Sequence, residues 1–188
     1  MAVNVVTGSH RSKIGALQQP SQETIEYAKT LNLHDLGPGD LALNEWDAAG
    51  LELPNQPLIR RYRLERVREQ LRKFDYAGMV LYDPLNTRYA TDSTNMQLWI
   101  SHNAARYALV MTDGPVIMFD YHSTGFLSDH SEVVDEVRPA TSWFYFGSGD
   151  RYAEHAGKWA AEIADLVNTH GGGNMRLAID RCNPEGLH

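Results

Sequence analysis

The sequence predicts an α/β fold in which helices flank a mixed β-sheet, preceded by an irregular N-terminal arm. Two amphipathic helical patterns bracket a series of short apolar runs, and one more apolar run follows the second helix. The order helix, several strands, helix, strand is typical of a sheet with helices packed on it. The chain has 188 residues, of which 43% are hydrophobic and 22% charged. It is therefore long enough to bury a sizeable core.

Residues 1–57 are predicted to form the arm, and residues 58–188 the domain. The arm contains several prolines and glycines, and its apolar residues follow no sustained period. A short helix is expected around Gln22–Leu31. The alternative, a partly disordered tail, stays open. The large apolar side chains expected to hold the arm to the domain or to a partner are Leu41, Leu43, Trp46, Leu51 and Leu53.

The first strong helical period begins at Leu58, with apolar residues at Leu64, Val67, Leu71 and Phe74. The other face is basic, because seven Arg or Lys stand against two Glu over residues 60–73. A basic helix can bind nucleic acid or an acidic membrane. The net charge of −7 and the pI near 5.6 disfavour a nucleic-acid binder. We therefore expect a solvated face that pairs with the acidic remainder of the chain.

The middle of the chain predicts five strands. Gly78–Tyr82 is an apolar run typical of a buried strand. A turn at residues 83–86 and a second short strand at Thr87–Thr91 are expected next. After a polar loop at residues 92–103, the runs Arg106–Met111 and Val116–Phe119 flank Thr-Asp-Gly-Pro, which predicts a hairpin. Val133–Val137 is expected to form a further strand.

The end of the chain predicts a second helix and a last strand. The helix is expected to start at Asp150 as N-cap and to end at the glycines 171–173. Arg176–Asp180 is the predicted last strand. Because an α/β domain usually continues from such a strand, the sequence suggests one module of a longer enzyme.

Few residues suggest a metal site. Asp120 and His122 would share a face of a continuing strand, and Asp129 and His130 lie nearby. No H-E-x-x-H motif or cysteine pair occurs, so we expect surface histidines and no metal site in this chain. The single cysteine, Cys182, fits a reducing cytoplasm. No window approaches the roughly 20 apolar residues that span a bilayer, and the first residues lack the order of a signal peptide.

Aromatic residues are concentrated in and beside the middle of the chain. Aromatic faces attract onium cations when water is excluded, although core packing explains most such residues. Trp99 differs because it stands in a polar loop with Asn95 and His102. The residues alone do not decide whether Trp99 lines a pocket or packs in the core. The aromatic residues of this part are Tyr89, Trp99, Tyr107, Tyr121, Trp143, Phe144, Tyr145 and Phe146.

The run Asp83–Trp99, followed by His102, Asn103 and Arg106, closely resembles the dimethylsulfoniopropionate (DMSP) lyases of the creatinase and prolidase-like pita-bread metalloenzymes. The general order of strand, D-x-x-N, Y-x-T and hairpin is that of the N-terminal domain of creatinase and prolidase relatives. The longer run through Trp99 is far more specific. Further matches are Leu41–Trp46, Ala49–Leu51, Trp143–Phe146 and His170–Ala178.

This resemblance implies a creatinase-like N-terminal domain at residues 58–188 of a homodimeric enzyme. The C-terminal pita-bread domain of the family, absent from this chain, is expected to hold iron or another divalent metal. The implied reaction is metal-assisted β-elimination of DMSP to dimethyl sulfide and acrylate. This chain would carry no catalytic residue and be inactive alone. It would contribute contacts within the dimer and walls of the substrate pocket. We assign the pocket walls to Trp99, Asn95, His102 and Tyr89.

Two other functions stay open. The N-terminal domain of an Xaa-Pro peptidase or of a creatinase-like hydrolase fits the general pattern equally well, although not the run through Trp99. A stand-alone binding or dimerisation module is the non-enzymatic possibility. We expect neither nucleic acid nor a membrane among the partners.

Overall fold

The computed structural model describes residues 39–94, 106–121, 124–143 and 145–181. All of them belong to a unit that runs from Leu36 to His188. The helix predicted around Gln22–Leu31 lies outside the described residues.

Two helices open the described part of the chain. The first, α2 (Asp40–Ala48), lies inside the stretch predicted as an irregular arm, and none of its residues is buried. The second, α3 (Gln56–Lys73), is the predicted basic helix. It begins two residues before Leu58 because the Asn55 side chain accepts a hydrogen bond from the Leu58 amide at 3.0 Å, with proline in the first turn.

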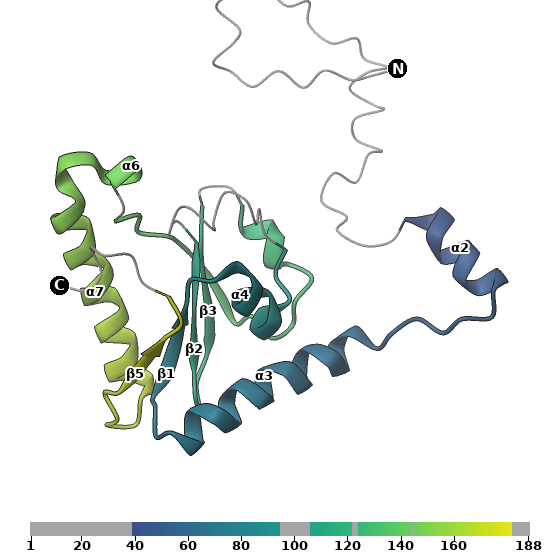
Figure 1. Cartoon of the computed structure of the whole chain (residues 1–188), viewed down its shortest axis with the longest axis horizontal. Helices are drawn as coiled ribbons and strands as arrows, with labels where there is room; N and C mark the ends of the chain where they lie inside the picture. The colour runs from purple at the N-terminus through teal and green to yellow at the C-terminus, as the bar shows by residue number, and fades with distance from the viewer. Residues whose placement is uncertain (1–38, 95–105, 122–123, 144, 182–188) are drawn as a thin grey trace, which may run out of the picture. The chain divides into compact units, whose positions relative to one another are not determined.

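Five strands form one mixed sheet, which confirms the predicted fold class (Figure 1). Their spatial order is β4-β3-β2-β1-β5. The central pairs β1–β2 and β2–β3 are antiparallel, whereas β3–β4 and β1–β5 are parallel. The strands are β1 (Gly78–Leu81), β2 (Tyr107–Met111), β3 (Val116–Asp120), β4 (Glu136–Pro139) and β5 (Leu177–Ile179).

Helices cover both faces of the sheet, as Figure 1 shows. The predicted second helix, α7 (Tyr152–His170), packs on one face, and α3 with α4 (Pro84–Thr91) packs on the other. Strand side chains alternate between two cores, so Val80 lies on the α7 side and Leu81 on the α3 side. All residues of β2 and β3 are buried, which explains why the predicted hairpin appears in the sequence as two continuous apolar runs.

The predicted turn at 83–86 and strand at Thr87–Thr91 are wrong, because these residues form α4. The Asp83 carboxylate caps the helix by accepting hydrogen bonds from the amides of Leu85 and Asn86 at 2.9 and 3.2 Å. Pro84 follows at the first helical position, where its fixed φ favours a helix. The threonines suggested a strand, yet Thr91 donates its hydroxyl back to the Thr87 carbonyl, as threonine can within a helix.

Two further boundaries differ from the prediction. The strand expected at Val133–Val137 begins only at Glu136, because Glu132 and Val133 form a turn before it. The Asp135 carboxylate then accepts from the Val116 amide at 2.7 Å. Asp150 is not the N-cap of α7. It lies in the 3₁₀ turn η3 (Gly149–Arg151), which follows α6 (Tyr145–Ser148) and leads directly into the helix. A second 3₁₀ turn, η2 (Gly125–Ser128), lies between β3 and β4.

Candidate functional site

Of the four residues predicted to bind substrate, the structure describes Tyr89. The other three, Asn95, Trp99 and His102, lie outside the described residues. For the predicted substrate site, the structure therefore describes the surroundings of Tyr89 and the residues on either side of segment 95–105.

Tyr89 lies on α4 and lines a groove of about 370 Å³ between α3, α4 and β1. Tyr89 is 40% exposed, and the Arg63 guanidinium lies 5.7 Å from the centroid of its ring. A second cation on that face of the ring would have to displace Arg63, because like charges repel. The remaining lining is mainly apolar and consists of Arg66, Val67, Gln70, Leu71, Met79, Leu81 and Asn86.

A buried ion pair joins the ends of the two central strands. Arg106, directly before β2, donates through Nε to the Oδ2 atom of Asp120 at 3.0 Å, and both side chains are only 2% exposed. Hairpin pairing explains the contact, because Tyr107 is opposite Phe119 and the next pair outward is Arg106 with Asp120. One feature of the sequence could have indicated this pair. Arg106 directly precedes the first apolar run of the predicted hairpin, and Asp120 directly follows the second.

This ion pair is extended by hydrogen bonds to both sides of segment 95–105. The Nη2 atom of Arg106 donates to the Ser93 hydroxyl at 2.5 Å, and that hydroxyl lies 2.7 Å from the hydroxyl of Ser128. The Asp120 carboxylate also accepts from the Thr124 hydroxyl at 2.6 Å. Ser93 precedes the segment and Arg106 follows it, so the network holds the two flanks of the segment together.

The D-x-x-N motif that carries the general family pattern has a structural role here. Asp83 caps α4, and Asn86 donates to the Oδ2 atom of Asp180 at 3.0 Å. The Asp180 carboxylate also accepts from the amide of Tyr82 at 2.8 Å. These contacts join the start of α4 to the end of β5, so they position α4 against the sheet.

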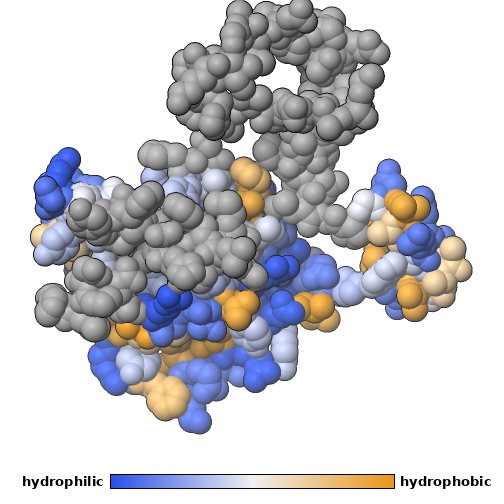
Figure 2. Space-filling model, turned by 45° about the horizontal axis from the view of Figure 1, so that its top comes forward, coloured by the Kyte–Doolittle hydropathy of each residue, from blue (hydrophilic) through white to orange (hydrophobic). Residues whose placement is uncertain are grey.

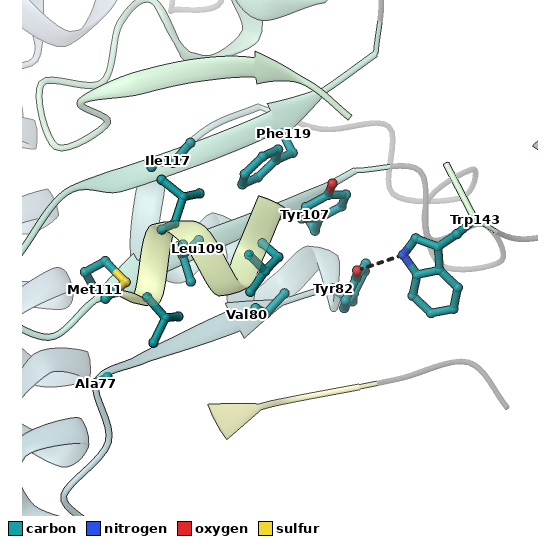
Figure 3. Packing of buried hydrophobic residues seen from close by; sticks show 12 residues of the cluster. Ala77, Val80, Tyr82, Tyr107, Leu109, Met111, Ile117, Phe119 and Trp143 are labelled. Carbon is teal, nitrogen blue, oxygen red and sulfur yellow. Dashed lines mark hydrogen bonds between the residues drawn. The ribbon is translucent and has the colours of Figure 1, made fainter. Parts of the chain in front are cut away.

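Several of the aromatic residues considered as cation binders belong to the core (Figure 3). Tyr107 and Trp143 are fully buried, and the Trp143 indole donates to the Tyr82 hydroxyl at 3.2 Å. Tyr107 stacks on Phe119 with ring centroids 4.5 Å apart. Burial raises the pKa of the Tyr107 hydroxyl well above its usual range. Core packing therefore accounts for these rings.

The residues considered for a metal site do not gather in the described part of the chain. Asp120 is committed to Arg106, and the His130 Nε2 atom lies 2.9 Å from the Asp92 carbonyl. His122 and Cys182 lie outside the described residues. Among the residues that the structure describes, no three His, Cys, Asp or Glu side chains are placed to hold one ion.

The basic face of α3 pairs with acidic and carbonyl groups, as predicted. Arg60 contacts the carboxylates of Asp92 and Glu132 at 2.9 and 2.7 Å. Arg68 donates to two backbone carbonyls next to the hairpin turn, and Arg72 pairs with Asp113 at 2.9 Å. Arg60, Arg68 and Arg72 of this basic face therefore have partners within the fold.

Comparison with known proteins finds close relatives and confirms the predicted resemblance. The chain is 44% identical over 156 residues to the dimethylsulfoniopropionate lyase DddP of Roseovarius nubinhibens, a match that covers 83% of this chain and 35% of the relative. It is 42% identical over 157 residues to DddP of Roseobacter denitrificans, covering 84% of this chain and 35% of that protein. The chain thus spans about a third of the length of the curated relatives it matches. No protein-family model matches it.

In the described part, none of the helices is both long and apolar enough to cross a bilayer.

Proposed function

We propose that this chain is the N-terminal domain of a DddP-like DMSP lyase, which cleaves DMSP to dimethyl sulfide and acrylate. The identity of 44% over 156 residues to one such lyase carries the proposal. The proposal includes a homodimer, as the resemblance implies, and a cytoplasmic location, which the single cysteine suggested. The general family pattern alone would equally suit a peptidase or a creatinase-like hydrolase, but both relatives reported above are DMSP lyases.

The proposed reaction is a β-elimination. A base removes the proton alpha to the carboxylate, the electron pair forms the new carbon–carbon double bond, and the carbon–sulfur bond breaks. Dimethyl sulfide leaves with the electrons of that bond, and acrylate remains. The described residues do not fit the metal that the resemblance implies, since no three candidate ligands converge among them. We therefore assign the iron or other divalent metal, and the base, to sequence outside this chain, and we derive no step through the metal.

The role proposed for this chain is to bind the substrate and exclude water. A tryptophan face attracts a sulfonium cation by roughly 0.5–2 kcal/mol, and we assign that contact to Trp99. We assign Asn95, His102 and Tyr89 to the rest of the substrate pocket. The buried pair of Arg106 with Asp120, joined to Ser93, supports this role because it holds the two flanks of segment 95–105 together.

The proposal is tested by measuring dimethyl sulfide release from DMSP. The assay compares the 188-residue chain with the same chain continued through its genomic reading frame. We expect release from the longer protein and none from the 188-residue chain, since the base and the metal are assigned outside it. Release by neither protein would contradict the lyase function, and proline dipeptides and creatine would then be assayed. Release by the 188-residue chain would contradict the non-catalytic role.

Replacing Trp99 by alanine in the longer protein is expected to raise the KM for DMSP by roughly 2- to 30-fold, because the sulfonium loses its aromatic wall. Steady-state kinetics with a headspace assay for dimethyl sulfide would measure the change. Trp99→Phe, which keeps an aromatic face, should lose less. Tyr152→Ala removes a 45% exposed ring on α7 and serves as the matched control. Unchanged kinetics for Trp99→Ala would remove this residue from the site.

A further inference from the structure

The ion pair of Arg106 with Asp120 lies where stability alone explains it poorly. Among the residues that the structure describes, these two are the only buried charged side chains, whereas hydrophilic residues cover much of the surface seen in Figure 2. Removing two charges from water is costly, and an apolar pair of similar volume is often at least as stable. Arg106 also leaves one donor unused, because its buried Nη1 atom has no hydrogen-bond partner among the described residues. The pair therefore calls for a role besides stability.

The Arg106 guanidinium joins the start of β2 to the chain just after α4. Its Nε atom donates to Oδ2 of Asp120 at 3.0 Å, and its Nη2 atom donates to the Ser93 hydroxyl at 2.5 Å. The fork of an arginine allows both contacts at once, whereas a lysine ammonium is a single point charge. The Ser93 hydroxyl also donates to the Leu127 carbonyl at 3.1 Å, and the Thr94 amide donates to the same carbonyl at 3.0 Å. Residues 93–94 are thus held from two sides, by β2 and by the connection between β3 and β4.

The residues held in this way adjoin those assigned to the substrate pocket. Tyr89 lies on α4, four residues before Ser93, and the other three pocket residues belong to segment 95–105, which Arg106 follows directly. A binding group contributes only when it is held in the productive geometry, and a displacement of about 1 Å can cost roughly a hundredfold in rate. An anchor at both flanks of the segment limits such displacements.

We propose that Arg106 and Ser93 are positioning residues for substrate binding, and that Asp120 holds the Arg106 guanidinium in the orientation this role requires. The inference rests on the proposed lyase function and extends it to residues that do not touch the substrate. Arg106 is not assigned to the substrate carboxylate, because Asp120 already balances its charge and a second carboxylate would leave a net negative charge in the interior. Arg106 acts through Ser93 on the neighbouring pocket residues.

Two variants of the longer protein separate positioning from stability. Ser93→Ala removes the acceptor of Arg106 and keeps the pair with Asp120. The double variant Arg106→Met with Asp120→Asn leaves no charge in the interior and removes the donor to Ser93. For both variants we expect a KM for DMSP at least roughly threefold higher and a kcat within about twofold of wild type, because weaker binding raises KM. A smaller folded fraction would instead lower the apparent kcat and leave KM unchanged.

Thr112→Val is the matched control. Thr112 follows β2 directly, at the end opposite Arg106, and its hydroxyl donates to the Tyr76 carbonyl at 2.6 Å. The variant removes one hydrogen bond of a buried side chain, as Ser93→Ala does, but at the far end of the strand. Its KM should therefore equal that of the wild type. Urea unfolding of every variant measures the accompanying change in stability.

The wild-type release of dimethyl sulfide is measured first, so that a failure of the lyase function is distinguished from a failure of this inference. No release by the wild-type longer protein would overturn the lyase function and the inference with it. With an active wild type, an unchanged KM in either variant would overturn the inference alone, since both variants break the same link. An equal rise of KM in Thr112→Val would also overturn it, because the effect would then follow any loss of a buried hydrogen bond.

Discussion

Replacing Arg106 by methionine is expected to lower the free energy of unfolding by about 3–5 kcal/mol. The substitution leaves the Asp120 carboxylate at 2% exposure with no cation beside it. An unpaired buried charge has lost its hydration without compensation, and this cost exceeds that of losing an ordinary hydrogen bond. Urea unfolding of the 188-residue chain, followed by circular dichroism, would measure the loss.

A double variant distinguishes the charge effect from a packing effect. Asp120→Asn keeps an oxygen for the Thr124 hydroxyl and the Tyr121 amide, which both contact Oδ1 of Asp120. Combined with Arg106→Met it leaves no charge in the interior, so the double variant should lose much less than the sum of the two single variants. Lys158→Met removes an exposed pair with Glu154 and should cost far less than either buried substitution, because solvent screens exposed charges. Additive losses from the two buried residues would show that their pairing contributes little.

Replacing Trp143 by alanine is expected to lower the free energy of unfolding by about 3–5 kcal/mol. Trp143 is fully buried, with its ring centroid 5.9 Å from that of Tyr82 and 5.4 Å from that of Trp159 (Figure 3). Removal of the indole would open a cavity at this end of the core and leave the Tyr82 hydroxyl without the indole N–H, which donates to it. Thermal and urea unfolding would measure the effect.

Two matched variants accompany this prediction. Trp143→Phe keeps most of the buried ring and removes the N–H donor, so it should lose clearly less than the alanine variant. Tyr152→Ala truncates an aromatic side chain that is 45% exposed and should cost about 1 kcal/mol or less. A loss for Trp143→Ala as small as that of Tyr152→Ala would contradict the assignment of Trp143 to the core.

Elements with a strong apolar pattern, either a helical period or a continuous run, could be predicted because their burial is recorded directly in the residues. The helices α3 and α7 contain apolar residues at helical spacing, and the hairpin β2–β3 contains two continuous apolar runs because its strands are buried on both faces. The α4 helix could not be recognised in this way. It is eight residues long and rich in threonine and polar residues, and its one clear signal was the Asp83-Pro84 pair at its start.

The candidate site was predictable only in part. The run through Trp99 indicated the relatives, and the two DMSP lyases confirmed that resemblance. The network of Arg106, Asp120 and Ser93 was not foreseen, because these residues are 13 and 14 positions apart and meet only when the hairpin has formed. The basic face of α3 likewise indicated a charged surface but not its partners, which lie 32 and 72 residues away for Arg60.

The sequence by itself determined the α/β class, the hairpin, the two long helices and the resemblance to DMSP lyases, since each depends on neighbouring residues or on an ordered run of them. Only the tertiary structure decided which charges pair, which aromatic rings are buried and which carboxylates join distant elements. Asp180 shows the reason: its carboxylate binds Tyr82, Asp83 and Asn86, nearly a hundred residues earlier in the chain. The position of such a group depends on the completed parallel pairing of β5 with β1, and no local pattern encodes it.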